Sequence, residues 1–579
     1  MRLIASLIIA LLTAPAAFAD AAGDFAALVA DYEAFNEERN VLQRARRGDL
    51  EAAAQWPDAG FEAVEEQQAA MEAFHERLEA IDAEALEGVD RASYAVLSHR
   101  LDTAVAIPAE RRAMLPFTND SGFHTLPDFA ARSAPAGSVE AIEAWITRIE
   151  TLPEYLAQHQ AWLERGVETG VTQPREIVPG VMDQIEAQIR EGEESGLYAP
   201  LRSLPASIPD EEQARLRAAA IEAIETRANP ALRELHAFFE ETYLPSARES
   251  LGARALPGGE DFYRALVRDY TSLDMTPEEV HQTGLDEVAR IRAEMEAVIE
   301  ATGFEGSFGE FLDFLRTDPQ FYAETDEELL HYAAWLSKRA DDEMPAFFNR
   351  LPRLPYGVRP VPEAIAPNYT TARYWPGDLE AGQAGGYMVN TYRLDQRPLY
   401  EMPALTLHEA VPGHHHQIAL AQEMEGMPEF RKQSFITAFV EGWALYSEYL
   451  GRDMGFYEDP YDLFGALTYE MWRACRLVVD TGIHWYGWTR EEAEACLLEN
   501  SALAEFNITN EVSRYIAWPG QALGYKPGEI LIRDLREQGE ARLGADFDLA
   551  AFHDALLSDG GVPLDFLEAK MRAWIAEQE

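Results

Sequence analysis

Four of the thirteen histidines of this 579-residue chain fall between residues 408 and 416, in the sequence HEAVPGHHH. His408 and Glu409 match the start of the H-E-x-x-H motif, in which two histidines one helical turn apart bind zinc and the glutamate acts as a general base. The segment therefore predicts a zinc site beside a glutamate that can activate water. That combination is typical of amide hydrolysis.

The second histidine comes later than in the standard motif. His408 and His414 are six positions apart, which is about 9 Å along a regular helix and too far for two zinc–nitrogen bonds of roughly 2 Å. Pro412 and Gly413 stand between them, and proline interrupts helical hydrogen bonds while glycine accepts unusual dihedral angles. We expect two residues to bulge out, so that His414 returns to the metal.

The third ligand is expected on a following helix. Glu441 lies in the apolar sequence FVEGW, and Glu448 follows it on the same helical face. A carboxylate among Phe, Val, Trp and Leu side chains is costly unless it is paired or bound to a metal. We therefore predict Glu441 as a ligand and Glu448 as a group that orients a ligand histidine.

Four motifs together carry a resemblance to a known family: HEAVPGHHHQ, FVEGWALYSE, RLVVDTGIHWYGWTREEA and EVSRYIAWPGQALGYK. They resemble the DUF885 family, which is similar to helical gluzincin peptidases of the thimet-oligopeptidase and thermostable-carboxypeptidase kinds. The resemblance covers nearly the whole mature chain and is strongest from Leu256 onwards. It leaves His414 and His415 as alternatives for the second ligand, and the Gly-His pair that often closes the gluzincin motif favours His414.

The resemblance implies one zinc ion held by His408, His414 and Glu441, and a short peptide as the substrate. It further implies that Glu409 takes a proton from water and passes one to the leaving amine. The developing oxyanion needs further hydrogen-bond donors, for which the resemblance and the residue types indicate His484 and Tyr525.

Residues that could bind the substrate are predicted at five further positions. Two are cations suited to a substrate carboxylate, one is a weaker oxyanion donor, and two lie on a predicted strand whose exposed edge could bind an extended peptide. A role in packing or in ion pairs is an open alternative for these side chains, and Asn390 equally fits the end of a turn. In that order the residues are Arg514, Lys526, Tyr515, Tyr387 and Asn390.

The charge of the chain excludes some classes of partner. There are 101 acidic and 48 basic residues, a formal net charge of -53. A surface this negative repels phosphate backbones and anionic lipid, so nucleic acid is not expected as a partner. The composition, 47% hydrophobic and 26% charged, is that of an ordinary globular protein.

The first nineteen residues have the pattern of a cleavable signal peptide. Arg2 precedes an apolar run over residues 3–12, and Ala17-Phe18-Ala19 forms an A-x-A site before Asp20. The run is about half the roughly 20 residues that a membrane helix needs, and no cysteine follows the site to carry a lipid. We expect cleavage after Ala19 and a periplasmic or secreted protein with no membrane span. Retention of the segment as an anchor is the alternative.

The pattern of the remaining chain predicts a mostly α protein. Residues 20–250 read as successive amphipathic helices, for example 61–81 and 211–228, and residues 251–579 as a catalytic helical region that continues the same fold. A capping box at Thr276 predicts a helix towards Glu300. The proline-rich residues 351–367 are expected to be irregular, and strands are expected at 366–374 and 386–392. From the resemblance we expect a large gluzincin-like fold with a deep cleft, zinc at its floor and a small sheet at its rim.

Two cysteines, Cys475 and Cys496, lack the spacing of a zinc motif. They are expected to be either two buried thiols or a disulfide permitted by an oxidising compartment. Two alternatives to a peptidase also stay open. One is a catalytically silent peptide-binding protein, and the other is a zinc amidohydrolase acting on a non-peptide amide. The motifs do not distinguish exopeptidase from endopeptidase action and do not fix side-chain specificity or oligomeric state.

Overall fold

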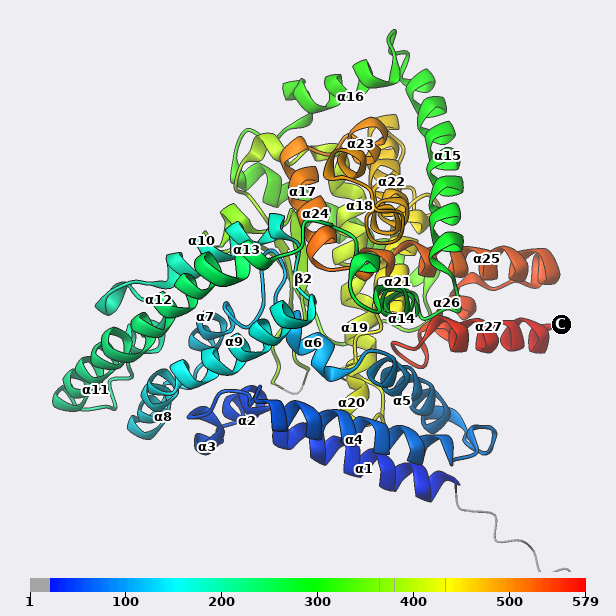
Figure 1. The fold of residues 1–579 in the computed structure, drawn as a ribbon. Coiled ribbons are helices and arrows are strands. Elements are labelled where there is room, and N and C mark those ends of the chain that lie inside the picture. Colours follow the sequence, from blue (N-terminus) through cyan, green and yellow to red (C-terminus); the bar gives the residue numbers. More distant parts are fainter. Residues whose placement is uncertain (1–20, 364, 380, 433) are drawn as a thin grey trace, which may run out of the picture.

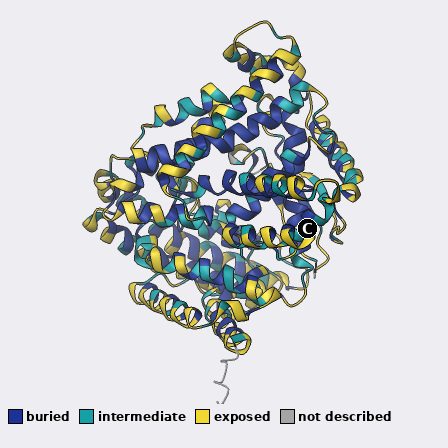
Figure 2. Cartoon of the chain, turned by 90° about the vertical axis from the view of Figure 1, so that its right-hand side faces the viewer, coloured by how far each residue is buried: buried dark blue, intermediate teal, exposed yellow. Residues whose placement is uncertain are grey.

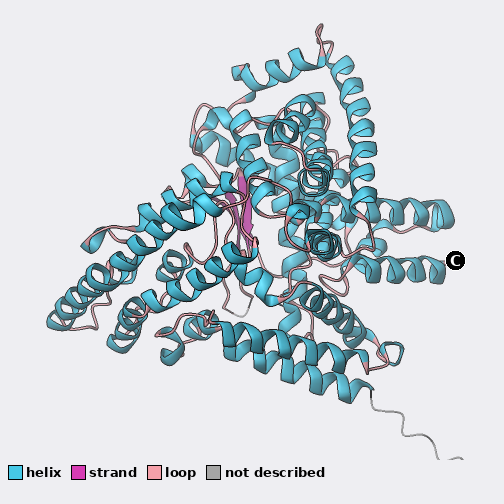
Figure 3. Cartoon of the chain, viewed as in Figure 1, coloured by secondary structure: helices cyan, strands magenta, loops and turns pink. Residues whose placement is uncertain are grey.

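The computed structural model describes residues 21–363, 365–379, 381–432 and 434–579. The expected signal peptide lies outside the described residues. Helices make up most of the chain, and one small sheet lies among them (Figure 3). The prediction of a mostly α fold is therefore confirmed.

The N-terminal part is a series of amphipathic helices, as their apolar spacing predicts. The predicted helix 61–81 is α4, and the predicted helix 211–228 is α11 followed by a π-helical turn at Ile224–Ala228. In Figure 1, α1 and α4 lie along the lower side of the molecule and α11 and α12 extend to the left. The helices are α1 (Ala21–Arg39), α2 (Val41–Arg46), α3 (Leu50–Ala53), α4 (Phe61–Glu79), α5 (Gly88–Ala106), α6 (Ala109–Met114), α7 (Leu126–Arg132), α8 (Val139–Glu150), α9 (Leu152–Thr169), α10 (Val178–Gln188), α11 (Asp210–Ala223), α12 (Asn229–Phe238) and α13 (Leu244–Ser246).

The C-terminal part contains the helices that carry the predicted motifs. They are α14 (Gly259–Thr271), α15 (Pro277–Thr302), α16 (Phe308–Thr317), α17 (Asp326–Phe347), α18 (Met402–Glu409), α19 (His414–Gln422), α20 (Glu429–Lys432), α21 (Thr437–Leu450), α22 (Pro460–Thr481), α23 (Arg490–Asn500), α24 (Glu505–Ala517), α25 (Lys526–Leu543), α26 (Leu549–Leu557) and α27 (Leu564–Gln578).

The capping box at the start of α15 is present as predicted. The Glu279 amide donates to Thr276 Oγ1 at 3.2 Å, and the Thr276 amide donates to Glu279 Oε2 at 2.8 Å. The helix then packs along α22. At Gly284 an added Cβ would lie 2.8 Å from the Cβ of Leu477, so only glycine allows the two helices to approach this closely.

The sheet has three strands, β1 (Tyr356–Pro360), β2 (Ala372–Trp375) and β3 (Gly385–Val389), in the order β1-β3-β2. β3 pairs parallel with β1 and antiparallel with β2, and all five of its residues are buried. The middle position of β3 leaves β2 at one edge of the sheet.

Two sequence expectations for this region are wrong. The proline-rich segment is not wholly irregular, because it contains β1. Pro360 is the last residue of that strand, at the outside of the sheet, where a missing amide donor is tolerated. The first predicted strand begins too early, since Ala366–Asn368 forms a 3-10 turn and the strand starts at Ala372.

Most of the buried apolar side chains form one large core that runs through both parts of the chain, and smaller clusters lie beside it. The large core includes Phe25 of α1 and Met571 of α27, and Figure 2 shows buried residues inside a layer of exposed ones. Among the described residues, the helices are too short or too polar for one of them to cross a bilayer.

Candidate metal centre

The turn between α18 and α19 brings the HEAVPGHHH histidines together. α18 ends at Glu409 and α19 begins at His414. Gly413 crosses the end of α18 so closely that an added Cβ would lie 1.9 Å from the His408 carbonyl oxygen. The Trp443 indole of α21 donates to the Pro412 carbonyl at 2.8 Å. The break therefore replaces the regular helix, as the sequence predicts, and α21 fixes its position.

Three predicted ligands converge at this turn. Glu441 Oε2 lies 3.4 Å from His408 Nε2 and 3.6 Å from His414 Nε2. One ligand atom of each residue lies within 4.8 Å of the others. In a tetrahedral zinc site with bonds of 2.0–2.1 Å the ligand atoms are roughly 3.3 Å apart. The three donors therefore have the types and the spacing that a zinc ion requires.

A buried carboxylate orients the first histidine. The Nδ1 of His408 lies 2.7 Å from Glu448 Oε1, and Arg473 of α22 lies 3.4 Å from the same oxygen. An ionised carboxylate only accepts, so Nδ1 carries the hydrogen and Nε2 is directed to the centre. The prediction for Glu448 corresponds to this geometry, and Arg473 is a further member that sequence reasoning missed.

The side chains of this centre shift each other's pKa values strongly. Burial opposes the charged form of His408, but hydrogen bonds to Glu441 and Glu448 and the nearby negative charge raise its pKa to about 10. Burial also opposes ionisation of Glu441, yet the two histidines lower its pKa to about 2. Both pKa shifts reflect the same interaction, in which a positively charged His408 lies between the carboxylates of Glu441 and Glu448. A divalent cation suits the same position and would displace the proton.

Glu409 points to the edge of the sheet. Its Oε2 accepts a hydrogen bond from the Tyr374 amide at 2.6 Å, so the free edge of β2 faces the end of α18. The Tyr374 hydroxyl lies 2.9 Å from His415 Nδ1. His415 therefore faces the strand, while His414 lies with the other ligands. Tyr374 is also a residue that sequence reasoning missed, because its pairing with Glu409 depends on how the strand and the helix meet.

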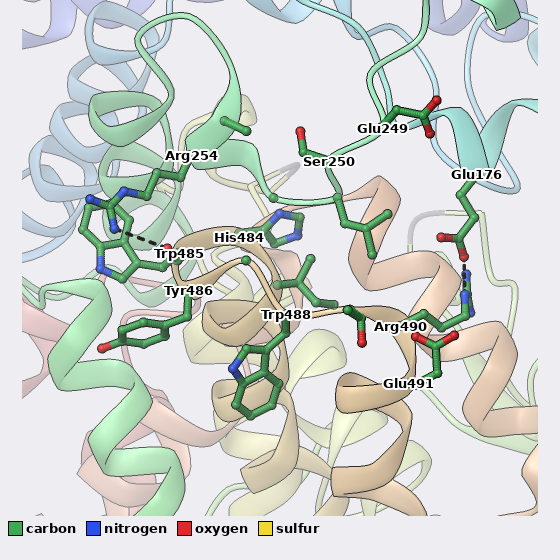
Figure 4. Close-up of a pocket in the computed structure, with 16 residues that line it drawn as sticks. Glu176, Glu249, Ser250, Arg254, His484, Trp485, Tyr486, Trp488, Arg490 and Glu491 are labelled. Carbon is green, nitrogen blue, oxygen red and sulfur yellow. Dashed lines mark hydrogen bonds and ion pairs between the residues drawn. The ribbon is translucent and has the colours of Figure 1, made fainter.

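His484 is not brought to the three ligands. Its Nδ1 accepts from the Ala253 amide at 3.1 Å, and its Nε2 lies 2.8 Å from the Tyr515 carbonyl oxygen. It lies in the π-helical turn Gly482–Tyr486, which follows α22. Arg473, which lies beside the metal centre, is eleven residues earlier, so at the rise of a regular helix the two residues are on the order of 16 Å apart along the axis. His484 also lines a hollow of about 690 Å³ whose wall includes neither the ligands nor Glu409 (Figure 4). The backbone contacts occupy both ring nitrogens, so neither nitrogen is free to donate to an oxyanion.

Two predicted tyrosines surround Arg476, one turn beyond Arg473 on α22. The Tyr515 hydroxyl accepts from Arg476 Nε and from the Trp472 indole, both at 2.9 Å. The Tyr525 ring lies 4.4 Å from the Arg476 guanidinium carbon. Tyr515 is thus engaged in packing, whereas Tyr525 stays a candidate donor.

The two predicted cations have partners within the protein. Arg514 donates to Gln521 Oε1 at 2.6 Å and lies 3.4 Å from Glu511. The side chain of Lys526 has no exposed surface, and its ammonium lies 2.6–3.0 Å from three carboxylates. The prediction that Lys526 binds a substrate carboxylate is wrong, because no face of its ammonium is open to solvent. The three carboxylates belong to Glu287, Glu470 and Glu529.

The prediction that Tyr387 and Asn390 bind an extended peptide is also wrong. Tyr387 of β3 and Asn390, which directly follows the strand, are fully buried. β3 is also the middle strand and so offers no free edge to a peptide. The Tyr387 hydroxyl lies 3.3 Å from Thr406 Oγ1. The side-chain amide of Asn390 donates to three backbone carbonyls of residues 366–370 and so closes that turn. β2 supplies the sheet edge near the centre instead.

Comparison with known proteins identifies the family and the fold. A family model described as "Bacterial protein of unknown function (DUF885)" matches residues 42–571. A crystal structure described as "the putative lipoprotein from Colwellia psychrerythraea" has a TM-score of 0.89 at 26% identity and covers 96% of this chain and 100% of its own. A second, "a putative lipoprotein of unknown function from Shewanella oneidensis", has a TM-score of 0.74 at 18% identity over 95% of this chain and 99% of its own. A comparison with curated proteins gives no match.

Proposed function

We propose that this chain, which belongs to the DUF885 family, is a zinc-dependent peptidase that hydrolyses amide bonds in short peptides. One observation carries the proposal. His408, His414 and Glu441 present three ligand atoms at zinc-like spacing, directly beside Glu409 in the HEAVPGH sequence. Two imidazoles and one carboxylate form a ligand set found in catalytic zinc sites.

Each residue around the centre has a separate role in the proposed reaction. When bound, zinc lowers the pKa of water towards neutrality and polarises a substrate carbonyl. Glu409 would accept the proton of the attacking water and return one to the leaving amine. The Tyr374 amide holds this carboxylate in place at 2.6 Å, and Glu448 keeps the Nε2 of His408 pointing into the centre.

The β2 edge and Tyr525 are the proposed substrate contacts. An extended peptide beside β2 would find main-chain partners next to Glu409. Tyr525 would donate to the developing oxyanion. The sequence has the pattern of a signal peptide, and a structure with the same fold and 26% identity is described as a "putative lipoprotein". We therefore propose that the activity lies outside the cytoplasm and acts on short peptides there.

The decisive variant is Glu409→Gln, which keeps the size of the side chain but removes the base. We expect purified wild-type protein to contain one zinc ion per chain and to cleave members of a short-peptide library. The variant should keep its zinc and lose roughly 10²- to 10⁴-fold in kcat, the range for removal of a general base. Metal analysis and mass spectrometry of the digest measure both quantities.

The same digest separates the alternatives. Equal cleavage by both proteins would remove Glu409 from the mechanism. A zinc-loaded wild type that binds library peptides without cutting them would favour a silent binding protein, and inertness towards peptides combined with turnover of other amides would favour an amidohydrolase.

A further inference from the structure

The two cysteines of the chain meet between α22 and α23. The sulfur atoms of Cys475 and Cys496 are 3.1 Å apart, about 1 Å beyond the 2.05 Å of a disulfide bond. The chain has no third cysteine to compete for either one. We propose that Cys475 and Cys496 form an intramolecular disulfide in the exported protein. This inference is independent of the proposed peptidase activity.

The backbone between the two cysteines sets this short separation. The Trp488 amide donates to the Gly482 carbonyl at 2.9 Å and closes the turn that reverses the chain. Gly487 has φ +79°, which favours glycine, and an added Cβ at Gly482 would lie 2.5 Å from the Trp488 ring. The Asn500 side chain donates to the Cys496 carbonyl at 2.8 Å. The helices are thus held with their thiols facing each other, so bond formation needs only small side-chain movements.

The two thiols differ in access, which fixes the order of the reaction. Cys496 is half-buried and Cys475 is fully buried. The Cys496 thiolate attacks a disulfide-containing oxidant, which forms a mixed disulfide and releases one thiol. The Cys475 thiolate then attacks the Cys496 sulfur and releases the second thiol. Two protons leave the cysteines, and two electrons reduce the oxidant to two thiols.

The setting of the pair favours oxidation. Disulfides form and persist in oxidising compartments such as the periplasm, which is the location that we propose. The bond would close residues 475–496 into a loop, and part of that loop forms one wall of the hollow in Figure 4. The labelled side chains from the loop are His484, Trp485, Tyr486, Trp488, Arg490 and Glu491.

The test counts free thiols in the full-length mature protein. The protein is treated with oxidised glutathione, unfolded, alkylated with iodoacetamide and weighed by mass spectrometry. We expect no alkylated cysteine and no glutathione adduct, and two alkylated cysteines after prior reduction with dithiothreitol. Cys475→Ala and Cys496→Ala should each show one free thiol or one adduct. Two alkylated cysteines in the oxidised wild type, or a bond between two molecules, would overturn the proposal.

A thermal measurement provides a second readout. Reduction should lower the Tm of the wild type by a few degrees, because the closed loop no longer constrains the unfolded chain. The double variant Cys475→Ala/Cys496→Ala should show the same Tm with and without dithiothreitol. An equal shift in both proteins would assign the effect to the reductant and overturn the link between the bridge and stability.

Discussion

Among the described residues, two groups of largely buried side chains have metal-like spacing, and they differ in the positive charge that neutralises them. In the metal centre, the ligand atoms of His408, His414 and Glu441 lie within 4.8 Å of one another. In a second group, which we call the ion-pair cluster, the carboxylates of Glu287, Glu470 and Glu529 lie equally close. Distance between ligand atoms therefore does not distinguish a metal site from a structural cluster.

The neighbouring cations make the difference. In the ion-pair cluster, the Lys526 ammonium lies 2.6 Å from Glu529 Oε2, 2.8 Å from Glu470 and 3.0 Å from Glu287, so it occupies the place that an ion would take. Two arginines, Arg290 and Arg533, contact the same carboxylates. The protein thus supplies its own positive charge.

The metal centre has a different arrangement. Its three ligand groups are one acid and two weak bases, and the nearby Arg473 pairs with Glu448 behind the centre instead of entering it. A buried carboxylate needs a cation or hydrogen bonds to offset its desolvation. The ion-pair cluster is therefore expected to stabilise the fold, and the metal centre to bind zinc.

The largest effect is expected for Glu441→Gln. Loss of a charged ligand should weaken zinc binding by more than the roughly 10- to 100-fold that loss of an outer partner costs, and the purified variant should contain little zinc. Glu287→Gln is the matched control, since it removes a carboxylate of the ion-pair cluster and should leave one zinc per chain. Metal analysis after dialysis measures both, and equal zinc in the two variants would erase the distinction between the clusters.

Lys526→Met should reverse that pattern. It leaves buried carboxylates short of one positive charge, which typically costs about 3–5 kcal/mol, so we expect a large drop in Tm with unchanged zinc content. Lys338→Met is the control, because Lys338 is exposed on the surface, where an ion pair contributes little. A Lys526→Met protein as stable as the wild type would contradict the role of the ion-pair cluster.

Glu448→Gln tests the outer part of the metal centre. The variant loses the carboxylate that holds His408 Nδ1, so zinc affinity should fall by roughly 10- to 100-fold while the fold persists. Competition with a chelator of known affinity gives the dissociation constant. An unchanged constant would mean that His408 keeps its orientation without Glu448.

The smallest effect near neutral pH is expected from titration of the ion-pair cluster. Burial opposes ionisation of Glu470, but Lys526 and Arg290 lower its pKa, and Arg290 and Lys526 likewise lower the pKa of the partly buried Glu287. In the unfolded chain these groups titrate near 4.5, so the unfolded state binds more protons in the acid range. The stability that they contribute is complete above about pH 4.5 and is lost as pH falls further. Unfolding curves from pH 7 to 3 should show this loss in the wild type and less of it in Lys526→Met.

The sequence predicts the convergence of the three candidate ligands better than the contacts around them, for a physical reason. His408, His414 and Glu441 lie on two consecutive motifs, and the Pro412-Gly413 break is a local signal. The approach of His408 and His414 follows from this local break, and the apolar surroundings of Glu441 in the sequence FVEGW single it out as the third ligand although it lies on another helix. The capping box of α15 is local in the same way, and it is confirmed.

The errors concern contacts between distant segments. Lys526 looks like a free cation in the sequence. Glu529 lies on the same helix, but only the packing of α25 near α15 and α22 reveals the other two carboxylates, those of Glu287 and Glu470. The contact between Tyr374 and Glu409 depends on strand order, which placed β3 in the middle of the sheet and β2 at its edge. The strand β1 is concealed by prolines that are tolerated because it lies at the outside of the sheet.

The central claim is that the motif histidines and Glu441 hold a zinc ion while the ion-pair cluster needs none. A crystal structure of protein purified with zinc, with anomalous data collected on both sides of the zinc edge, tests it most directly. We predict one anomalous peak, about 2 Å from the Nε2 atoms of His408 and His414 and bonded to Glu441. A peak among Glu287, Glu470 and Glu529, or none at the histidines of zinc-loaded crystals, would contradict the account.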